Sequence, residues 1–175
     1  MNRFKSVATR LAARRRSALR GFSLIELVIV VVIIGIIAAI AIPRLSRGAS
    51  GAADSALSGN LSVLRNAVDL YATEHGGTYP ALATFDTQLT QFTDSSGGTS
   101  ATKDATHIYG PYLRKVPTLP VGPSGYKNTT TVVDGSTGTP GTSAGAWFYN
   151  ASTGDIKANL ADAEKDSSSK SYNTY

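Results

Sequence analysis

The sequence predicts an α+β fold in which a long N-terminal helix packs against a small antiparallel sheet. An apolar run at residues 22–42 is long enough to form a helix, and apolar residues at helical spacing follow it after Pro43. Residues 146–150 carry three adjacent aromatic side chains, and a four-residue turn separates them from residues 155–159, which predicts a β-hairpin. The helix therefore precedes the sheet, and one modest domain follows the apolar run.

The apolar run has the length of a membrane-spanning segment. Its 21 residues would form a helix of about 31 Å, which matches a hydrocarbon thickness of about 30 Å. The run carries one charged residue, Glu26, and no Lys, Arg or His that would compensate it. An unpaired carboxylate in hydrocarbon costs about 2.5–3.5 kcal/mol on the insertion scales for Asp. Glu26 therefore needs a partner from outside the run; the alternative is a carboxylate that reaches water at the membrane edge.

The net charge of +5 is unevenly distributed. Seven of the 17 Lys and Arg residues lie in residues 1–21, which contain no acid, so the rest of the chain holds 10 basic and 12 acidic groups. Basic residues beside a membrane helix stay in the cytoplasm, and this predicts a single-pass chain whose C-terminus is outside. Arg44 and Arg47 on the far side weaken the asymmetry without reversing it. The basic segment is a topology signal, and no nucleic-acid partner is expected.

A specific motif joins the basic segment to the apolar run. Gly21 and Phe22 are followed by Ser23-Leu24-Ile25 and then by Glu26. This arrangement resembles the class III signal of type IV prepilins and type II secretion pseudopilins. The resemblance implies that a prepilin peptidase cleaves between Gly21 and Phe22 and N-methylates Phe22. It also implies an assembly role for Glu26, whose carboxylate would meet the new amino group of Phe22 in a neighbouring subunit.

The same resemblance extends to the helix and to a second, shorter motif. Gly35 and Pro43 match positions at which pilin helices carry a glycine and a helix-loosening proline. Residues 108–117 are similar to a segment of major pseudopilins that leads from the connecting loop into the sheet. The chain has no cysteine, whereas many type IV pilins carry a C-terminal disulfide loop. These features favour a pilin-like fold and, within the family, the major pseudopilin of a type II secretion system.

Five parts are expected along the chain. Residues 1–21 form a basic leader that is cleaved, and residues 22–43 form the membrane and assembly helix. Residues 44–76 continue this helix with an amphipathic stripe. Residues 77–161 form a connecting loop and the small antiparallel sheet domain, and residues 162–175 form a disordered tail.

The amphipathic stripe predicts how the outer domain packs. Apolar residues recur at intervals of three and four until Gly76-Gly77 ends the helix. We expect this stripe to pack on the hairpin face that carries Trp147 and Tyr149. His75 is expected to be exposed at the helix end, and a short helix capped by Thr84 is expected to follow. The stripe consists of Leu57, Leu61, Leu64, Val68 and Tyr71.

The sequence gives little support for an enzyme. His75 and His107 lie 32 residues apart with no catalytic pattern around them, and without cysteine the usual zinc-site spacings are missing. The resemblance to major pseudopilins allows a calcium site in the C-terminal region. The tail acids Asp162, Glu164 and Asp166, however, alternate with Ala and Lys, so solvated acids are the simpler expectation. No other cofactor is expected.

The expected function is therefore structural. The chain would insert in the bacterial inner membrane, lose its leader, and be assembled by an inner-membrane platform into a homo-oligomeric helical filament that is periplasmic or extracellular. The pseudopilus of type II protein secretion is the expected filament, and a type IV or DNA-uptake pilus is one alternative. A membrane-anchored extracytoplasmic binding domain that never polymerises is a second alternative. Ordinary secretion, with signal peptidase cutting near residues 39–41, is a third.

Overall fold

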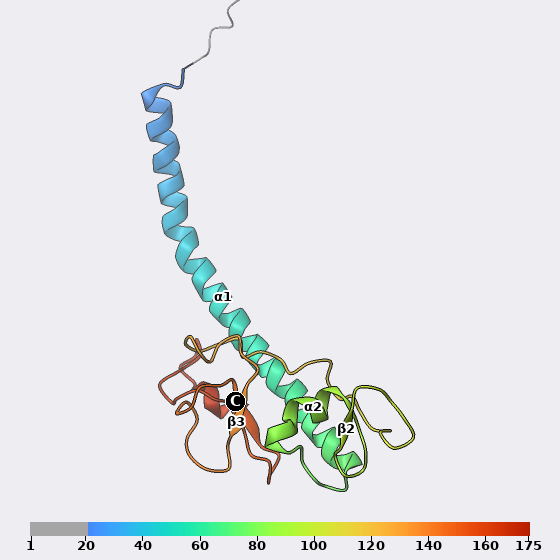
Figure 1. Ribbon diagram of the computed structural model, residues 1–175. Coiled ribbons are helices and arrows are strands. Elements are labelled where there is room, and N and C mark those ends of the chain that lie inside the picture. The colour runs from blue at the N-terminus through green and yellow to red at the C-terminus, as the bar shows by residue number, and fades with distance from the viewer. Residues whose placement is uncertain (1–20) are drawn as a thin grey trace, which may run out of the picture. The chain divides into compact units, whose positions relative to one another are not determined.

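The computed structural model describes residues 21–175, so the leader predicted at residues 1–21 lies outside this range apart from its last residue. The longest element is helix α1, Leu24–Glu74, which runs from blue to green in Figure 1. The chain divides into two compact units, Met1–Ile42 and Pro43–Tyr175, and the division falls within α1. An α+β fold with a long N-terminal helix and a small sheet is therefore confirmed.

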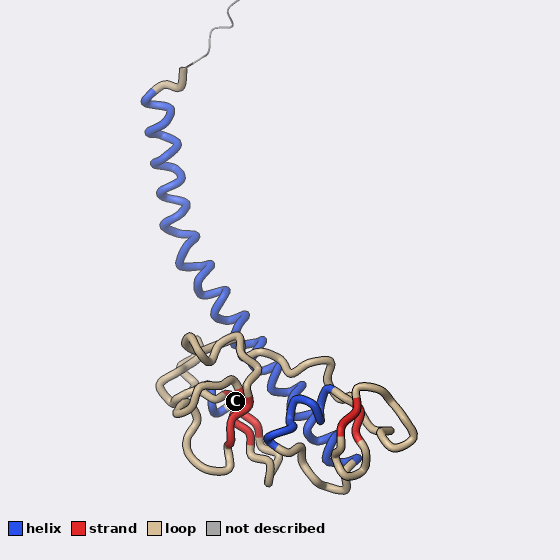
Figure 2. The backbone as a smooth tube through the Cα atoms, viewed as in Figure 1, coloured by secondary structure: helices blue, strands red, loops and turns tan. Residues whose placement is uncertain are grey.

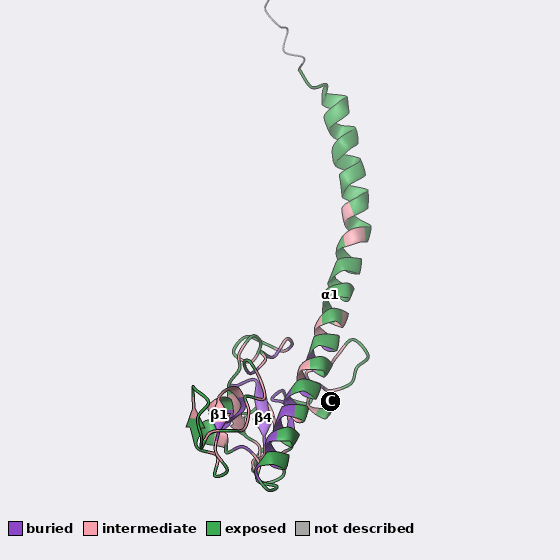
Figure 3. Ribbon diagram, turned by 90° about the vertical axis from the view of Figure 1, so that its right-hand side faces the viewer, coloured by how far each residue is buried: buried purple, intermediate pink, exposed green. Residues whose placement is uncertain are grey.

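The described residues of the first unit, 21–42, are exposed along nearly their whole length (Figure 3). Apart from Ser23 and Glu26 they are apolar or glycine, so the unit exposes an almost unbroken apolar surface. Large side chains such as Leu24, Ile34 and Ile42 are more than half exposed. Within the described chain, α1 is the one helix that is long and apolar enough to cross a membrane. A contiguous apolar surface of this extent marks a segment that contacts lipid or another protein rather than water.

Helix α1 continues through Gly35 and Pro43 without a break. Pro43 has no N–H to donate to the carbonyl four residues earlier, so one helical hydrogen bond is missing there. A Cβ added at Gly35 would meet no other atom within 4 Å. A requirement for a small residue at Gly35 would therefore come from a partner outside the chain, and the loosening expected at both positions stays a prediction.

The second unit packs its core on one face of α1. The buried stripe consists of Leu57, Leu61, Leu64, Val68 and Tyr71, each of which is at most 2% exposed. These residues share one hydrophobic core with Trp147 and Tyr149 of strand β4, Trp147–Tyr149, whereas Phe148 between them lies outside that core. Alternation along a strand places neighbouring side chains on opposite faces. The predicted packing of the stripe on the Trp147 face is confirmed.

Three short strands form the larger sheet of this unit, and all strands are red in Figure 2. Strands β3, Val132–Asp134, and β5, Ile156–Ala158, flank β4 on either side. β4 and β5 form the predicted antiparallel hairpin, in which Trp147 lies opposite Ala158. β3 pairs with β4 in parallel, which the sequence does not predict. A parallel neighbour needs a long crossover connection, and the glycine-rich residues 135–146 supply it.

The connecting region contains only short elements. A 3₁₀ turn, Leu82–Thr84, leads into helix α2, Phe85–Thr90, and strands β1, Phe92–Thr93, and β2, Thr99–Ser100, form a second antiparallel pair. The short helix occurs where it is predicted, but the Thr84 side chain makes no capping hydrogen bond. Thr84 ends the 3₁₀ turn with ψ at 15°, whereas a capping residue normally has extended backbone.

His75 is buried, and the expected exposure at the helix end is wrong. The side chain is 8% exposed, and its ring stacks on that of Tyr71 with 3.8 Å between centroids. Its Nδ1 lies 2.8 Å from the carbonyl oxygen of Tyr71, and its Nε2 lies 2.9 Å from that of Asp94. The position at the helix end is as the sequence predicts, but a loop nineteen residues away folds back over the ring.

Residues 162–175 pack on the rest of the second unit, so the predicted disordered tail is wrong. Tyr172, in the 3₁₀ turn Tyr172–Thr174, is 9% exposed and belongs to the core. Its hydroxyl donates to Oδ1 of Asp54 at 2.8 Å, and the backbone N–H and hydroxyl of Ser167 donate to Oδ2. Burial and the bond to Asp54 raise the pKa of Tyr172. The burial of Tyr172 and its hydrogen bond to Asp54 thus order this segment despite its polar composition.

A second set of contacts holds the end of the same segment. The Arg65 guanidinium on α1 donates to the carbonyl oxygens of Ile156 and Tyr175. The Tyr175 hydroxyl donates to the carboxylate of Asp166, and this bond lowers the pKa of Asp166. The ammonium of Lys170 lies 4.0 Å from the centroid of the Tyr175 ring. The segment is therefore fixed to α1 at two separate positions.

Replacing Asp54 with Ala should release residues 162–175 from the rest of the second unit. The change leaves the Tyr172 hydroxyl without its acceptor, which costs about 1–3 kcal/mol for a buried group. Limited digestion of the full chain with trypsin should then cut after the lysines of this segment several-fold faster than in the wild-type protein. Asp69→Ala, at an exposed position of the same helix, is the matched control. Equal digestion of both variants would show that Asp54 does not hold the segment.

Candidate functional site

The site residues predicted from the motif lie at the start of α1. Residues 21–23 precede the helix without regular secondary structure, and the Phe22 side chain is 76% exposed. A Cβ added at Gly21 would meet no other atom within 4 Å. Proteases cut where exposed backbone is free of secondary structure. The peptide bond between Gly21 and Phe22 therefore has the accessibility that cleavage requires.

Glu26 caps its own helix. Because α1 begins at Leu24, Ser23 is the N-cap residue and Glu26 is the third residue of the first turn. Oε2 of Glu26 accepts a hydrogen bond from the backbone N–H of Ser23 at 3.3 Å. The first N–H groups of a helix lack intrahelical acceptors, and a carboxylate in the first turn also interacts favourably with the helix dipole. The negative charge of Glu26 is thus partly compensated within the chain.

The sequence carries a signal for this capping, which the predictions above do not include. Ser23 and Glu26 have the Ser-x-x-Glu spacing of a capping box directly before an apolar run. The absence of a cation in that run predicts a carboxylate whose partner comes from another subunit. The structure provides a first partner at the same helix end. The Ser23 N–H therefore offsets, within a single chain, part of the free-energy cost of placing the Glu26 carboxylate in an apolar environment.

The Ser23 bond leaves Glu26 able to accept a second partner. A carboxylate has two oxygens with about four acceptor positions, and the structure uses one of them at Oε2. The side chain is exposed, so a cation from another molecule can approach Oε1 without breaking the cap. Hydrogen bonds between an ammonium group and a carboxylate are about twice as strong as neutral ones. The helix start is therefore suited to an intermolecular ion pair.

The tail acids on which a calcium site would depend hold their own segment instead. Asp162 accepts a hydrogen bond from the side-chain amide of Asn173 at 2.7 Å, and Asp166 accepts from Tyr175. Within residues 21–175, no group of three or more His, Asp or Glu side chains is placed to hold a metal ion. These carboxylates stabilise turns in the C-terminal segment.

His107 has an acidic partner, Asp104, which the sequence analysis does not predict. Its Nδ1 lies 2.9 Å from Oδ2 of Asp104, three residues earlier in an exposed loop. The backbone N–H groups of Thr106 and His107 donate to Oδ1 of Asp104, and the bonds from His107 in particular lower the pKa of Asp104. These contacts all lie within four consecutive residues, so the pair stabilises a turn of this loop.

Comparison with known protein families gives one match. Residues 16–42 match a family model described as a prokaryotic N-terminal methylation motif. The matched range contains the Gly21–Phe22 bond, Glu26 and the whole apolar run. This motif is that of type IV pilin-like precursors, which a prepilin peptidase processes and whose apolar N-terminus anchors them in the membrane. No curated protein and no solved structure matches the chain.

Proposed function

We propose that the chain is a structural, non-enzymatic subunit of a pilus-like filament, most specifically of the pseudopilus of type II protein secretion. The observation that carries this proposal is Glu26, an exposed carboxylate at the start of an apolar helix with acceptor positions to spare. The apolar surface of residues 21–42 has no partner in the described chain, so lipid or other copies of the chain must cover it.

Cleavage between Gly21 and Phe22 prepares the helix start for assembly. The cut removes seven basic residues and creates a new amino group on Phe22, which stays cationic when methylated. The leader holds the N-terminus on the cytoplasmic side, so its removal also frees the helix to move outward. A single reaction thus supplies the cation for assembly and removes the topological restraint.

Assembly pairs Glu26 of one subunit with the Phe22 amino group of an adjacent one. The contact is head-to-tail and does not close, so it grows a helical filament. Removing an ion pair from water gives little net stability, but losing one partner leaves a buried charge that costs about 3–5 kcal/mol. The pair therefore selects the register of subunits more than it stabilises them, and the Ser23 bond holds the carboxylate until its partner arrives.

The segment at residues 108–117 supports the pseudopilus over other filaments. Its sequence is similar to a segment of major pseudopilins, and in the structure it ties α2 to α1. The backbone N–H groups of Tyr112 and Leu113 donate to the carbonyl of Leu89, and the Tyr112 hydroxyl donates to Glu74 at 2.6 Å. The absence of cysteine supports the same choice. Filaments that extend beyond the cell surface would instead favour a type IV or DNA-uptake pilus.

Replacing Gly21 with Val should block processing without altering the fold. No atom lies within 4 Å of an added Cβ, so the chain itself has no steric need for glycine there. Intact-mass measurement of membranes from cells that also express the peptidase should find the full-length precursor. Gly48→Val, at a glycine equally free of neighbours, is the matched control and should be processed normally. A Gly21→Val chain that begins at Phe22 would contradict the proposed recognition of this bond.

A further inference from the structure

Three cations from distant parts of the sequence line two hollows in the second unit. Arg47 lies on α1, Lys127 lies in a turn of the connection to β3, and Lys165 lies in the C-terminal segment. The salt bridges found among the described residues involve none of the three. Positive charge on the non-cytoplasmic side of a membrane helix runs against the usual distribution, so membrane topology does not explain Arg47.

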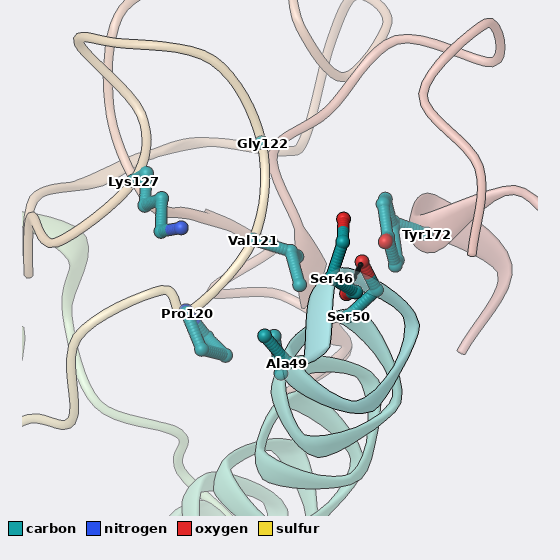
Figure 4. A pocket seen from close by; sticks show the side chains of 9 residues that line it. Ser46, Ala49, Ser50, Pro120, Val121, Gly122, Lys127 and Tyr172 are labelled. Atoms are coloured by element: carbon teal, nitrogen blue, oxygen red, sulfur yellow. Dashed lines mark hydrogen bonds between the residues drawn. The ribbon is translucent and has the colours of Figure 1, made fainter. Parts of the chain in front are cut away.

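Two hollows lie between these cations and share part of their walls. The hollow that holds Lys127 has a volume of about 300 Å³, and Figure 4 shows Lys127, Ser46, Ser50 and Tyr172 around it. The other hollow, of about 510 Å³, is lined by Arg47 and by the same two serines and tyrosine. Ser46, Ser50 and Tyr172 therefore separate two spaces that each contain cationic side chains.

The larger hollow has the chemistry of a phosphate site. Arg47 and Lys165 supply two cations, and Ser46 supplies a hydroxyl that makes no side-chain hydrogen bond within the described residues. The carboxylate in the lining, Asp166, already accepts hydrogen bonds from Tyr175 and from two backbone N–H groups. An arginine fork binds phosphate oxygens in pairs, and a lysine adds a point charge. The lining thus offers uncommitted donors to an oxyanion.

The sequence separation between the apolar run and Arg47 matches the thickness of the lipid headgroup layer. Arg47 follows Ile42, the last residue of the apolar run, by five residues in the sequence, and five helical residues rise by about 7.5 Å. Headgroups add about 5–8 Å on each side of the hydrocarbon core. Long Arg and Lys side chains place their charge in this layer readily.

We propose that this hollow binds the phosphate group of an anionic phospholipid in the extracytoplasmic leaflet while the subunit resides in the membrane. The proposal rests on the membrane residence in the proposed function and is independent of polymerisation. Arg47 and Lys165 bind the phosphate oxygens through charged hydrogen bonds, and the Ser46 hydroxyl donates a further hydrogen bond. Because extraction into a filament removes the subunit from the leaflet, lipid binding favours the membrane-resident pool over the assembled one.

Native mass spectrometry of the full chain in detergent, with phosphatidylglycerol added, tests this site. We expect the wild-type protein to retain phosphatidylglycerol in preference to phosphatidylcholine. The double substitution Arg47→Gln/Lys165→Gln should lower that binding about ten-fold. The matched control, Lys103→Gln/Arg114→Gln, removes the same charge from exposed positions outside the hollow and should leave binding unchanged. The basic leader is identical in all variants, so its own attraction to the lipid cancels.

Four further results test the lipid site. An equal loss in both double variants would mean diffuse charge attraction and would overturn the site. Competition by millimolar inorganic phosphate that removes all lipid preference would assign the hollow to a free ion instead of a headgroup. Glu26→Ala should bind phosphatidylglycerol normally, so a failure of filament assembly and a failure of this site give different results. An unchanged tryptic pattern for Arg47→Gln/Lys165→Gln, apart from cuts at the two substituted residues, would show that the variant is folded.

Discussion

Glu26→Ala should abolish filament assembly and leave cleavage between Gly21 and Phe22 intact. The substitution retains Gly21 and Phe22 but removes the carboxylate that, in the proposed assembly, pairs with the Phe22 amino group of the next subunit. An unpaired ammonium in the assembled bundle costs about 3–5 kcal/mol, which weakens each addition by more than about a hundredfold. Electron microscopy of sheared filaments measures assembly, and the intact mass of the membrane-bound chain measures processing.

Glu26→Gln separates the two roles of this side chain. Glutamine keeps an oxygen that can accept the hydrogen bond from the Ser23 N–H, but it has no charge for an ammonium partner. We expect this variant to fail in assembly as completely as Glu26→Ala. Normal filaments from Glu26→Gln would mean that capping of the helix matters and ion pairing does not. Normal filaments from both variants would leave Glu26 without an assembly role.

Trp147→Ala should lower the free energy of unfolding of the second unit by about 3–5 kcal/mol. Trp147 is fully buried, and its Nε1–H donates to the carbonyl oxygen of Pro117 at 2.9 Å. The smaller side chain leaves a cavity against the apolar stripe of α1 and an unpaired carbonyl. Small domains are stable by only about 5–15 kcal/mol, so the loss removes a large part of the total.

Pulse proteolysis in increasing urea measures this loss without depending on the fluorescence of the chain's single tryptophan. Val63→Ala, on the exposed face of the same helix, is the control and should shift the stability by less than about 0.5 kcal/mol. A Trp147→Ala chain as stable as the control would contradict the central place of Trp147 in the core.

Regular local patterns account for the parts of the fold that the sequence predicts. The stripe from Leu57 to Tyr71 follows helical spacing, and the run around Trp147 with its turn follows strand alternation, so both are readable without tertiary information. The parallel pairing of β3 with β4 depends on how a long crossover returns, and that connection carries no periodic signal. The same holds for Tyr172, whose burial depends on Asp54, 118 residues away.

In the candidate site, too, local features can be predicted from the sequence and long-range ones cannot. Gly21, Phe22 and Glu26 form a short contiguous motif, and the structure places them together because they are neighbours in the chain. The Ser23–Glu26 cap is equally local and was within reach of sequence reasoning. The hollow beside Arg47 cannot be predicted from the sequence, because its two cations, Arg47 and Lys165, are more than a hundred residues apart in the chain. Only the folded C-terminal segment brings Lys165 to the helix.

The N-terminal sequence and intact mass of the chain purified from its native membrane test the central claim most directly. A processed pilin-like subunit begins at Phe22 and is heavier than the unmodified chain by one methyl group. A chain that begins near Pro43 would indicate ordinary secretion, with the apolar helix discarded. A chain that still begins at Met1 would contradict the claim, because without the free amino group of Phe22 the proposed partner of Glu26 does not exist.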